Sequence, residues 1–418
     1  MTTPGGASRV AVPDATETDA LRARAPRAAR ELTDRALVAM TAAVTLPILW
    51  MGYGTDIDVT DVLASADSIR AGDYTPSRPP GVPVFEAVAA VLDPVGGHLL
   101  LNLATAAGGA ATVVGIARLV RGWGHPNGDL IALAFLASPI AVISSTSTAD
   151  FIWAMTFFVW GCLVHLRGRS VPAGVLLALA IGARLPSVLL VVALLVADGW
   201  DAAHRRRCVR TALVALPLGA LLYVPSWLAY DRSTGFLDPA EGWRSFGNNL
   251  GRFLYKGYVT AGGLAIVLIA MAVPALVAAL PRWRTDPMLR LGVLGCAAAG
   301  ALYFVYPWKF SHLLPAVAML LLWLGASRGN RRPFLVALIV ALAVNGVVTF
   351  RPLAPDRPAE ASTGEWDPAV TPGLLLNDIA CRLDAMDEPP QPLNRGAWAC
   401  SLKPMRGDLP EPEPTGDR

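Results

Sequence analysis

Long apolar runs separated by short polar connections dominate the chain between residues 36 and 350. A membrane-spanning helix needs about 20 mostly apolar residues, and fewer where neighbouring helices shield it. By this measure the pattern predicts about eleven spans, and therefore an all-α fold, a polytopic transmembrane helical bundle. The runs lie at about 36–53, 97–117, 130–147, 151–166, 172–184, 186–199, 212–230, 260–280, 291–306, 312–326 and 334–350.

Composition agrees with this class. Of the 418 residues, 54% are hydrophobic and 16% are charged, whereas soluble domains carry roughly 25% charged residues. The formal net charge of +3 is too small to indicate a nucleic-acid partner. We therefore expect a multi-pass protein of the cell membrane.

Arginines gather in alternate connections, among them "RLVRGWG", "HLRGR", "HRRRCVR", "PRWRTDPMLR" and "SRGNRR". The N-terminal segment before residue 36 is also rich in arginine. Because short cytoplasmic loops carry an excess of Lys and Arg, this bias predicts a cytoplasmic N-terminus. An odd number of spans then predicts an extracytoplasmic C-terminus.

Three regions follow from these patterns. Residues 1–33 are polar and rich in Ala, Arg and Thr, which predicts a disordered cytoplasmic N-terminus and an uncleaved signal-anchor as first span. Residues 34–350 form the transmembrane domain, and residues 351–418 an extracytoplasmic Pro-rich tail.

Within the tail, "PGLLLNDIACRLDAMDE" has helical apolar spacing. Because that compartment is oxidising, Cys381 and Cys400 are predicted to form a disulfide. Cys162, Cys208 and Cys296 show no metal-ligand spacing.

The two runs at 172–199 are unusually short. Both flanks are arginine-rich, so the chain must cross and return within this segment, and helices of about 13 residues reach only ~20 Å. They would turn at "GARLPS". Non-helical backbone at membrane depth is tolerated where it lines protein or a wet cavity. The sequence therefore predicts an outward-facing cavity with Arg184 at its floor.

An acidic stretch follows the first run: "GTDIDVTDVLASADSIRAGDYTPSRPPGVPVFE", residues 54–86. Carboxylates at i and i+2 in an extended segment point to opposite sides, so Asp56 and Asp58 are expected to have different roles. One would face a cavity as general base, and the other would cap the following amphipathic helix. Asp61, Asp67 and Asp73 are interpreted as hydrated surface charges.

Four ordered pieces of residues 36–326 resemble the GT-C superfamily. These are "DID" with "AGDY" and "SRPPGVPVFE", then "SPIAVISSTSTADFIWAMTFFVWG", "PAGVLLALAIGARLPSVLLV" and "YPWKFSHLLPAVAMLLLWLG". The superfamily comprises polytopic membrane glycosyltransferases that use polyprenyl-phosphate sugars, and the chain is similar to its mannosyltransferase-like members. The tail departs from the pattern, because it is far smaller than the soluble domains of some members.

The resemblance implies that residues 34–350 are a transmembrane glycosyltransferase domain, a hexosyl- or pentosyltransferase. It would move a sugar from a polyprenyl-phosphate donor to an acceptor hydroxyl on the extracytoplasmic face. The implied partners are this donor, an envelope glycan, lipid or protein acceptor, and membrane lipids. The general base would be an outer-loop aspartate, Asp56 in preference to Asp58. No cofactor is implied, although the two carboxylates could hold a divalent cation weakly.

Donor-phosphate binding requires cationic groups where negative charge grows on the leaving group. Arg184, Arg78, Lys309 and His312 are the candidates. Alternatively, Arg184 pairs with a buried acid, Arg78 bonds loop carbonyls, and Lys309 and His312 anchor the interface. The loop 231–259 would form an interfacial helix, and a lid over the donor.

Two further acids are site candidates. Asp150 in "STAD" either serves the site or caps the next helix, and Glu86 either serves the site or complements a helix dipole. Two other functional classes remain open for the whole chain. A polytopic transporter or lipid flippase would show inverted repeats, and a structural scaffold would need no converging charges.

Overall fold

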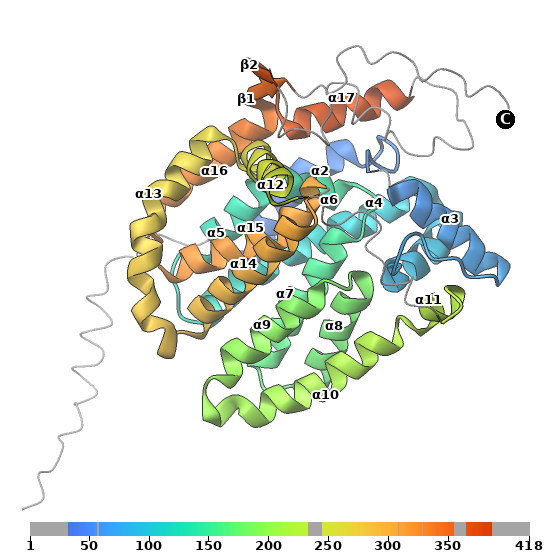
Figure 1. The fold of residues 1–418 in the computed structure, drawn as a ribbon, viewed down its shortest axis with the longest axis horizontal. Helices are drawn as coiled ribbons and strands as arrows, with labels where there is room; N and C mark the ends of the chain where they lie inside the picture. Colours follow the sequence, from blue (N-terminus) through green and yellow to red (C-terminus); the bar gives the residue numbers. More distant parts are fainter. Residues whose placement is uncertain are drawn as a thin grey trace, which may run out of the picture.

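The computed structural model describes residues 32–56, 58–232, 245–307, 309–327, 329–354 and 365–386. These residues form a bundle of helices with one two-stranded antiparallel hairpin (Figure 1). The predicted all-α fold class is confirmed.

The first elements are α2 (Asp34–Thr45), η1 (Leu46–Ile48), α3 (Asp58–Ala71) and α4 (Pro83–Gly122). Helix α4 has 40 residues but bends at Gly96 and Gly97, where the backbone leaves helical geometry. Its first part carries Glu86 beside α3, and its second part contains the predicted run 97–117. A glycine pair after Pro94 explains the bend, because neither residue type supports a helix interior.

Short helices follow. They are α5 (Gly128–Ala137), α6 (Pro139–Thr146), α7 (Phe151–Leu166), α8 (Ser170–Ala183) and α9 (Ser187–Gly199). Helices α5 and α6 are bent by 73° against each other. The predicted short pair is present as α8 and α9, with 14 and 13 residues, and Arg184 stands at the turn between them.

The second half contains η2 (Ala202–His204), α10 (Arg205–Leu221), α11 (Val224–Ala229), α12 (Phe246–Ala261), α13 (Gly263–Ala279), η4 (Leu280–Arg284), α14 (Pro287–Val305), η5 (Phe310–Leu313), α15 (Leu314–Ala326) and α16 (Arg332–Val347). The chain then forms the hairpin of β1 (Val348–Ala354) and β2 (Glu365–Pro372) and ends its described part with α17 (Leu374–Met386). The predicted tail helix is thus present. It lies against α16 and α6 (Figure 1).

The count of eleven spans is not confirmed. Among the described helices, four are long and apolar enough to cross a membrane, and the bent pair α5–α6 makes a fifth. Five further apolar helices have 10–17 residues, which is short for a hydrocarbon core of about 30 Å. The apolar helices make the chain a multi-pass membrane protein.

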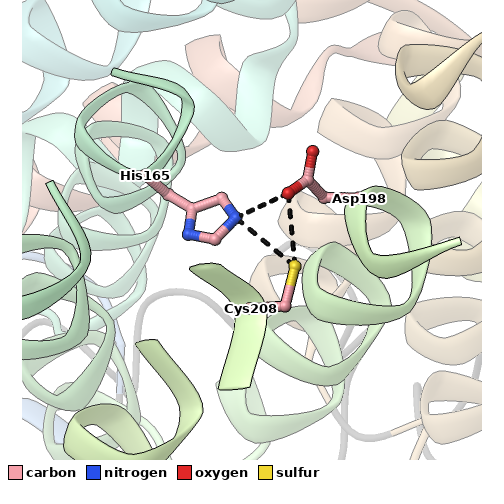
Figure 2. Close-up of side chains that lie close together, drawn as sticks. All are labelled: His165, Asp198 and Cys208. Carbon is pink, nitrogen blue, oxygen red and sulfur yellow. Dashed lines mark hydrogen bonds and ion pairs between the residues drawn. The ribbon is translucent and has the colours of Figure 1, made fainter. Parts of the chain in front are cut away.

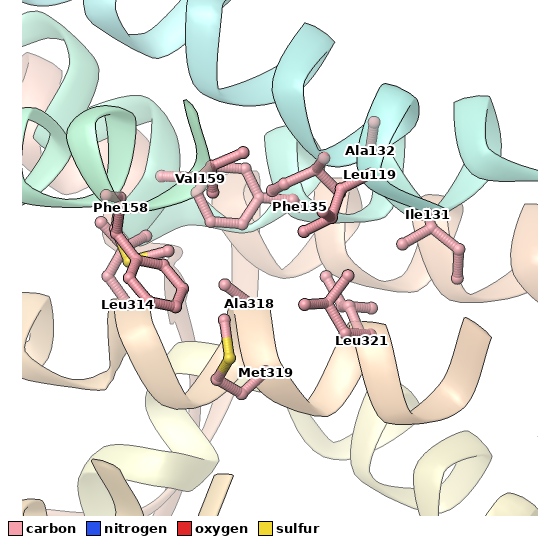
Figure 3. Close-up of a cluster of buried hydrophobic side chains, with 14 of the residues drawn as sticks. Leu119, Ile131, Ala132, Phe135, Phe158, Val159, Leu314, Ala318, Met319 and Leu321 are labelled. Carbon is pink, nitrogen blue, oxygen red and sulfur yellow. The ribbon is translucent and has the colours of Figure 1, made fainter. Parts of the chain in front are cut away.

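The hydrophobic core lies where α4, α5, α7 and α15 meet (Figure 3). Leu119, Phe135, Phe158, Ala318 and Met319 are at most 1% exposed. Helices α10 and α13 instead present large apolar side chains on the surface, including Leu213 and Met271. In a membrane protein such a surface faces lipid, so burial inside the protein and burial in the bilayer together account for the apolar composition.

A tight loop connects η1 to α3 and determines where Asp56 lies. Gly54 has φ +117°, and a Cβ at this position would lie 2.7 Å from Cβ of Ser147. The Tyr53 carbonyl accepts a hydrogen bond from the Thr148 amide at 2.7 Å. Buried Asn102 donates to the carbonyls of Leu49 and Gly52, at 3.1 and 2.7 Å. The loop is therefore fixed against α4 and against the residues that precede α7.

We expect Gly54→Ala to lower the melting temperature in detergent more than Gly72→Ala does. Both glycines have positive φ, which L side chains disfavour, but a Cβ at Gly72 meets nothing within 4 Å. The collision with Ser147 adds an overpacking cost of about 1–3 kcal/mol. Equal melting temperatures for the two variants would contradict this account of the loop.

Candidate active site

Asp56, Asp58 and Lys309 meet at the end of the bundle where α3 begins, which we call the α3 end. The Lys309 ammonium lies 2.5 Å from Oδ1 of Asp56 and also forms an ion pair with Oδ1 of Asp58. Both carboxylate side chains are 15% exposed. Lys309 directly precedes η5. Its contact with Asp56 joins residues that are 253 positions apart in the sequence.

The prediction that Asp56 and Asp58 point to opposite sides is wrong. It assumed an extended segment, but the chain turns into α3 here: the Val59 amide donates to the Asp56 carbonyl at 3.1 Å. Oδ1 of Asp56 also accepts the Asp58 amide at 2.9 Å. Asp58 opens α3, as one of the two alternatives had it, yet its side chain faces the same lysine as Asp56 does.

Arg78 and Arg184 extend this contact into a chain of alternating charges. Arg78 forms an ion pair with Oδ2 of Asp58 and lies 3.2 Å from Oδ2 of Asp150. Arg184 lies 2.7 Å from the same oxygen of Asp150. Three acids and three bases therefore alternate as Asp56, Lys309, Asp58, Arg78, Asp150 and Arg184, which we call the ion network.

Electrostatics within the ion network follow from its burial. Burial raises the pKa of Asp58, but the charges of Arg78 and Lys309 together outweigh burial and hold that pKa well below its ordinary value. Burial lowers the pKa of Arg78, and the charges of Asp58 and Asp150 more than compensate, so that the net shift is upward. Asp58 and Arg78 are therefore both charged at neutral pH.

Asp150 stands at the N-cap position of α7, but its side chain makes no capping hydrogen bond. Its carboxylate binds the two arginines instead. The capping interpretation of Asp150 is therefore wrong. Of the two interpretations of Arg184, the structure shows the pairing with a buried acid, since Asp150 is 2% exposed.

His312 stands beside the ion network without an ion pair to it among the described residues. Its ring centroid lies 5.5 Å from that of Phe151. The Arg184 guanidinium stacks over the same Phe151 ring, 3.8 Å from the ring centroid. Arg184, Phe151 and His312 line a small cavity of about 40 Å³. Two of the four residues predicted to bind phosphate, Arg184 and His312, thus border this cavity, whereas Arg78 and Lys309 do not line it.

Glu86 lies outside the ion network and organises the loop that carries Arg78. It is 0% exposed, and its Oε1 accepts the amide and hydroxyl of Ser77, at 2.9 and 2.5 Å, and the Val82 amide at 3.2 Å. Its Oε2 accepts the Tyr74 hydroxyl at 2.5 Å. Burial and the Glu86 carboxylate raise the pKa of Tyr74, so this phenol remains a donor. Glu86 therefore positions Arg78 through the backbone of residues 77–82.

An apolar cavity of about 240 Å³ lies among α12 to α16. It begins at Leu313, next to His312, and continues along α15 to Leu324. Phe253 and Gly257 of α12 form another part of its wall. The cavity and the ion network thus lie on either side of the short η5 segment.

Helix α12 brings two further basic residues to this region. Arg252 is 1% and Lys256 6% exposed. Lys256 donates to the Pro307 carbonyl at 2.8 Å and lies 5.5 Å from the centroid of Phe310. Burial lowers the pKa of Lys256 to about 7, assisted by the positive charges of Arg252 and Lys309. The sequence predicts an interfacial helix here but no role for Lys256. Its signal was the polar face of this amphipathic helix, on which Asn249, Arg252 and Lys256 follow at helical spacing and are buried.

A second cluster of polar side chains lies at the opposite end of α7, α9 and α10 (Figure 2). Nε2 of His165 and Sγ of Cys208 lie 3.0 and 3.2 Å from Oδ2 of Asp198. These residue types suit a metal ion, and sequence spacing did not reveal them. However, Arg207 already binds both oxygens of Asp198, at 2.6 and 2.7 Å. We interpret the cluster as a structural contact that holds α7, α9 and α10 together.

The predicted disulfide lies outside the described residues, because the structure does not describe Cys400. Cys381 belongs to α17 and is buried.

No family model matches the chain, and no curated protein matches it. Two solved structures have a similar fold, both of ArnT from Cupriavidus metallidurans, one bound to undecaprenyl phosphate and one in the apo state. Their sequence identities are 19% and 20%, and both have a TM-score of 0.49. In each, the match covers 69% of this chain and 58% of the ArnT chain. The similarity therefore concerns the arrangement of the helices, and no conclusion about the reaction rests on it.

We expect the melting temperature of the wild-type protein to rise with pH between about 7 and 9.5 relative to that of Lys256→Met. The folded protein holds the pKa of Lys256 at about 7, against 10.5 for an ordinary lysine. Between these values the unfolded chain binds more protons, so stability increases with pH. Lys256→Arg stays charged throughout and should lack the rise. Parallel curves for all three proteins would contradict the lowered pKa.

Proposed function

We propose that the protein is a membrane glycosyltransferase that moves a sugar from a polyprenyl-phosphate donor to an acceptor hydroxyl. The reaction would take place at the α3 end, on the predicted extracytoplasmic face. The observation that carries the proposal is the ion network, which joins a partly exposed carboxylate to a lysine and two arginines. An apolar cavity begins at Leu313, in the same η5 segment that Lys309 precedes. The resemblance of four ordered sequence pieces to the GT-C superfamily supports the same reaction.

Asp56 suits the role of general base better than Asp58. Both oxygens of Asp58 form ion pairs, one with Lys309 and one with Arg78. Asp56 uses Oδ1 for Lys309 and for the Asp58 amide, and its Oδ2 accepts no hydrogen bond from any residue that the structure describes. A carboxylate oxygen without a donor can accept the proton of an acceptor hydroxyl.

In the proposed step, Oδ2 of Asp56 takes the hydroxyl proton while the acceptor oxygen attacks the anomeric carbon. The bond between that carbon and the phosphate oxygen breaks, and the lipid phosphate leaves with the electron pair. Cationic donors placed at the leaving oxygen lower the barrier because they bind the growing charge more strongly than they bind the ground state. Arg184 lines the small cavity beside His312, which supports this role, and Arg78 shares Asp150 with it.

The apolar cavity supports a lipid-linked donor. Its walls are almost entirely aliphatic or aromatic side chains from α12 to α16, and they start next to His312. A polyprenyl chain can be held there by burial of its methyl and methylene groups, while its phosphate stays at the polar end. Lys256, positioned at that end, can add a positive charge near the phosphate at or below neutral pH.

We expect Asp56→Asn to lower kcat for sugar transfer by roughly 10²–10⁴-fold, the usual contribution of a general base. The substitution preserves shape and removes the basic oxygen. Asp73→Asn is the matched control, since Asp73 is exposed, and it should behave as wild type. Transfer can be measured with purified protein and a polyprenyl-phosphate sugar. Sugar transfer that survives both Asp56→Asn and Asp58→Asn would overturn the base assignment, and lipid translocation without transfer would favour a flippase.

We expect Arg184→Gln to lower kcat/KM for the lipid donor by roughly 10²–10³-fold, because a donor to the leaving phosphate is lost. Arg167→Gln is the control, since Arg167 is exposed at the other end of α7. Inhibition by free polyprenyl phosphate should weaken in Arg184→Gln and remain in Arg167→Gln. Unchanged inhibition would place the phosphate elsewhere.

A further inference from the structure

Helix α17 of the tail makes an unusual buried contact with the bundle. Arg382 and Asp378 face inward from consecutive turns, are 1% and 5% exposed, and form an ion pair of 2.8 Å. A buried ion pair of this kind contributes little to net stability, because desolvation opposes it. The pair therefore matters less for net stability than for the other residues that Arg382 and Asp378 bind.

Arg382 binds the end of α6 and the residues that follow it. Its Nη1 donates to the Thr146 carbonyl at 2.9 Å, and its Nη2 donates to the Ser147 hydroxyl at 2.5 Å. Ser147 and Asp150 belong to the same short connection into α7. Arg382 thus fixes the segment from which Asp150 reaches Arg78 and Arg184.

Asp378 binds the other segment of the site. Its Oδ1 accepts the hydroxyl of Thr55, the residue directly before Asp56. Thr55 is buried, at 9% exposed, and its neighbour Gly54 packs against Ser147. The two segments that carry Asp56 and Asp150 therefore contact each other and share one anchor, the Arg382–Asp378 pair.

We propose that α17 is a positioning element of the active site: the Asp378–Thr55 and Arg382–Ser147 contacts hold Asp56 and Asp150 in their reactive places. The inference rests on the proposed function. Arg382, Asp378 and Thr55 are positioning residues that act through Asp56 and Asp150, and the tail is part of the catalytic domain. Misplacement of a catalytic group by about 1 Å can cost on the order of 10²-fold in rate.

Thr55→Val tests the proposal with the least disturbance, because it replaces one hydroxyl by a methyl group. We expect kcat to fall by roughly 10–100-fold, while the KM for the donor stays within about twofold, since Thr55 contacts Asp56 and not the phosphate-binding arginines. Thr55→Ser keeps the hydroxyl and should restore kcat. Asp378→Asn should lower kcat at least as much as Thr55→Val, because it also weakens the ion pair with Arg382, and the double variant should be no worse than Asp378→Asn alone.

Thr41→Val is the matched control. Thr41 is also buried, at 1% exposed, but its hydroxyl donates within α2 to the Leu37 carbonyl at 2.9 Å. It should leave kcat unchanged. Hydrogen exchange on the full-length protein in detergent adds a readout that needs no substrate: Thr55→Val and Asp378→Asn should raise deuterium uptake in peptides that cover residues 53–60, and Thr41→Val should not.

Wild-type kcat in Thr55→Val, or unchanged deuterium uptake at 53–60 in both variants, would overturn the positioning role. Failure of the proposed function gives a different result. In that case the wild-type protein transfers no sugar, or Asp56→Asn transfers it normally, while the exchange experiment still reports whether α17 holds the segment.

Discussion

Charges buried inside a helical bundle must be paired, and this constraint shapes the α3 end of the molecule. Removing a carboxylate or a guanidinium from water costs several kcal/mol per ion unless an opposite charge and hydrogen bonds compensate. The ion network meets this demand with equal numbers of acids and bases. Its residues come from five parts of the chain: the start of α3 with the loop before it, the connection before α4, the start of α7, the α8–α9 turn and the segment before η5. Pairing thus draws distant parts of the chain to one place.

A balanced network also explains how a site can remain stable without substrate. Each arginine and the lysine has an acidic partner, so the ion network carries no excess charge of its own. An anionic phosphate at this site would compete with Asp150 for Arg184, and the acid would retain Arg78. A phosphate that must displace Asp150 from Arg184 gains less free energy than one that meets an unpaired arginine, and this competition favours weak, reversible binding.

Much of this architecture could be predicted from the sequence, and the failures have physical causes. Apolar periodicity located the helices, and the length of the short pair placed Arg184 at its turn. The count of eleven spans from the same reasoning is not confirmed, because helices such as α9 are apolar yet short for a membrane crossing. Which acid pairs with which base was not predictable, since Asp150 and Arg78 are 72 residues apart and meet through tertiary packing. The roles of Asp378 and Arg382 were missed, although their spacing of four on an amphipathic helix was a visible signal.

The Thr55–Asp378 contact joins residues 323 positions apart in the sequence. Segments near the beginning of the chain enter the membrane long before α17 has been synthesised. Contacts between such distant residues carry a large loop-closure entropy and form late in folding. The geometry around Asp56 can therefore be completed only when α17 arrives, and until then the loop before α3 lacks the Asp378 contact.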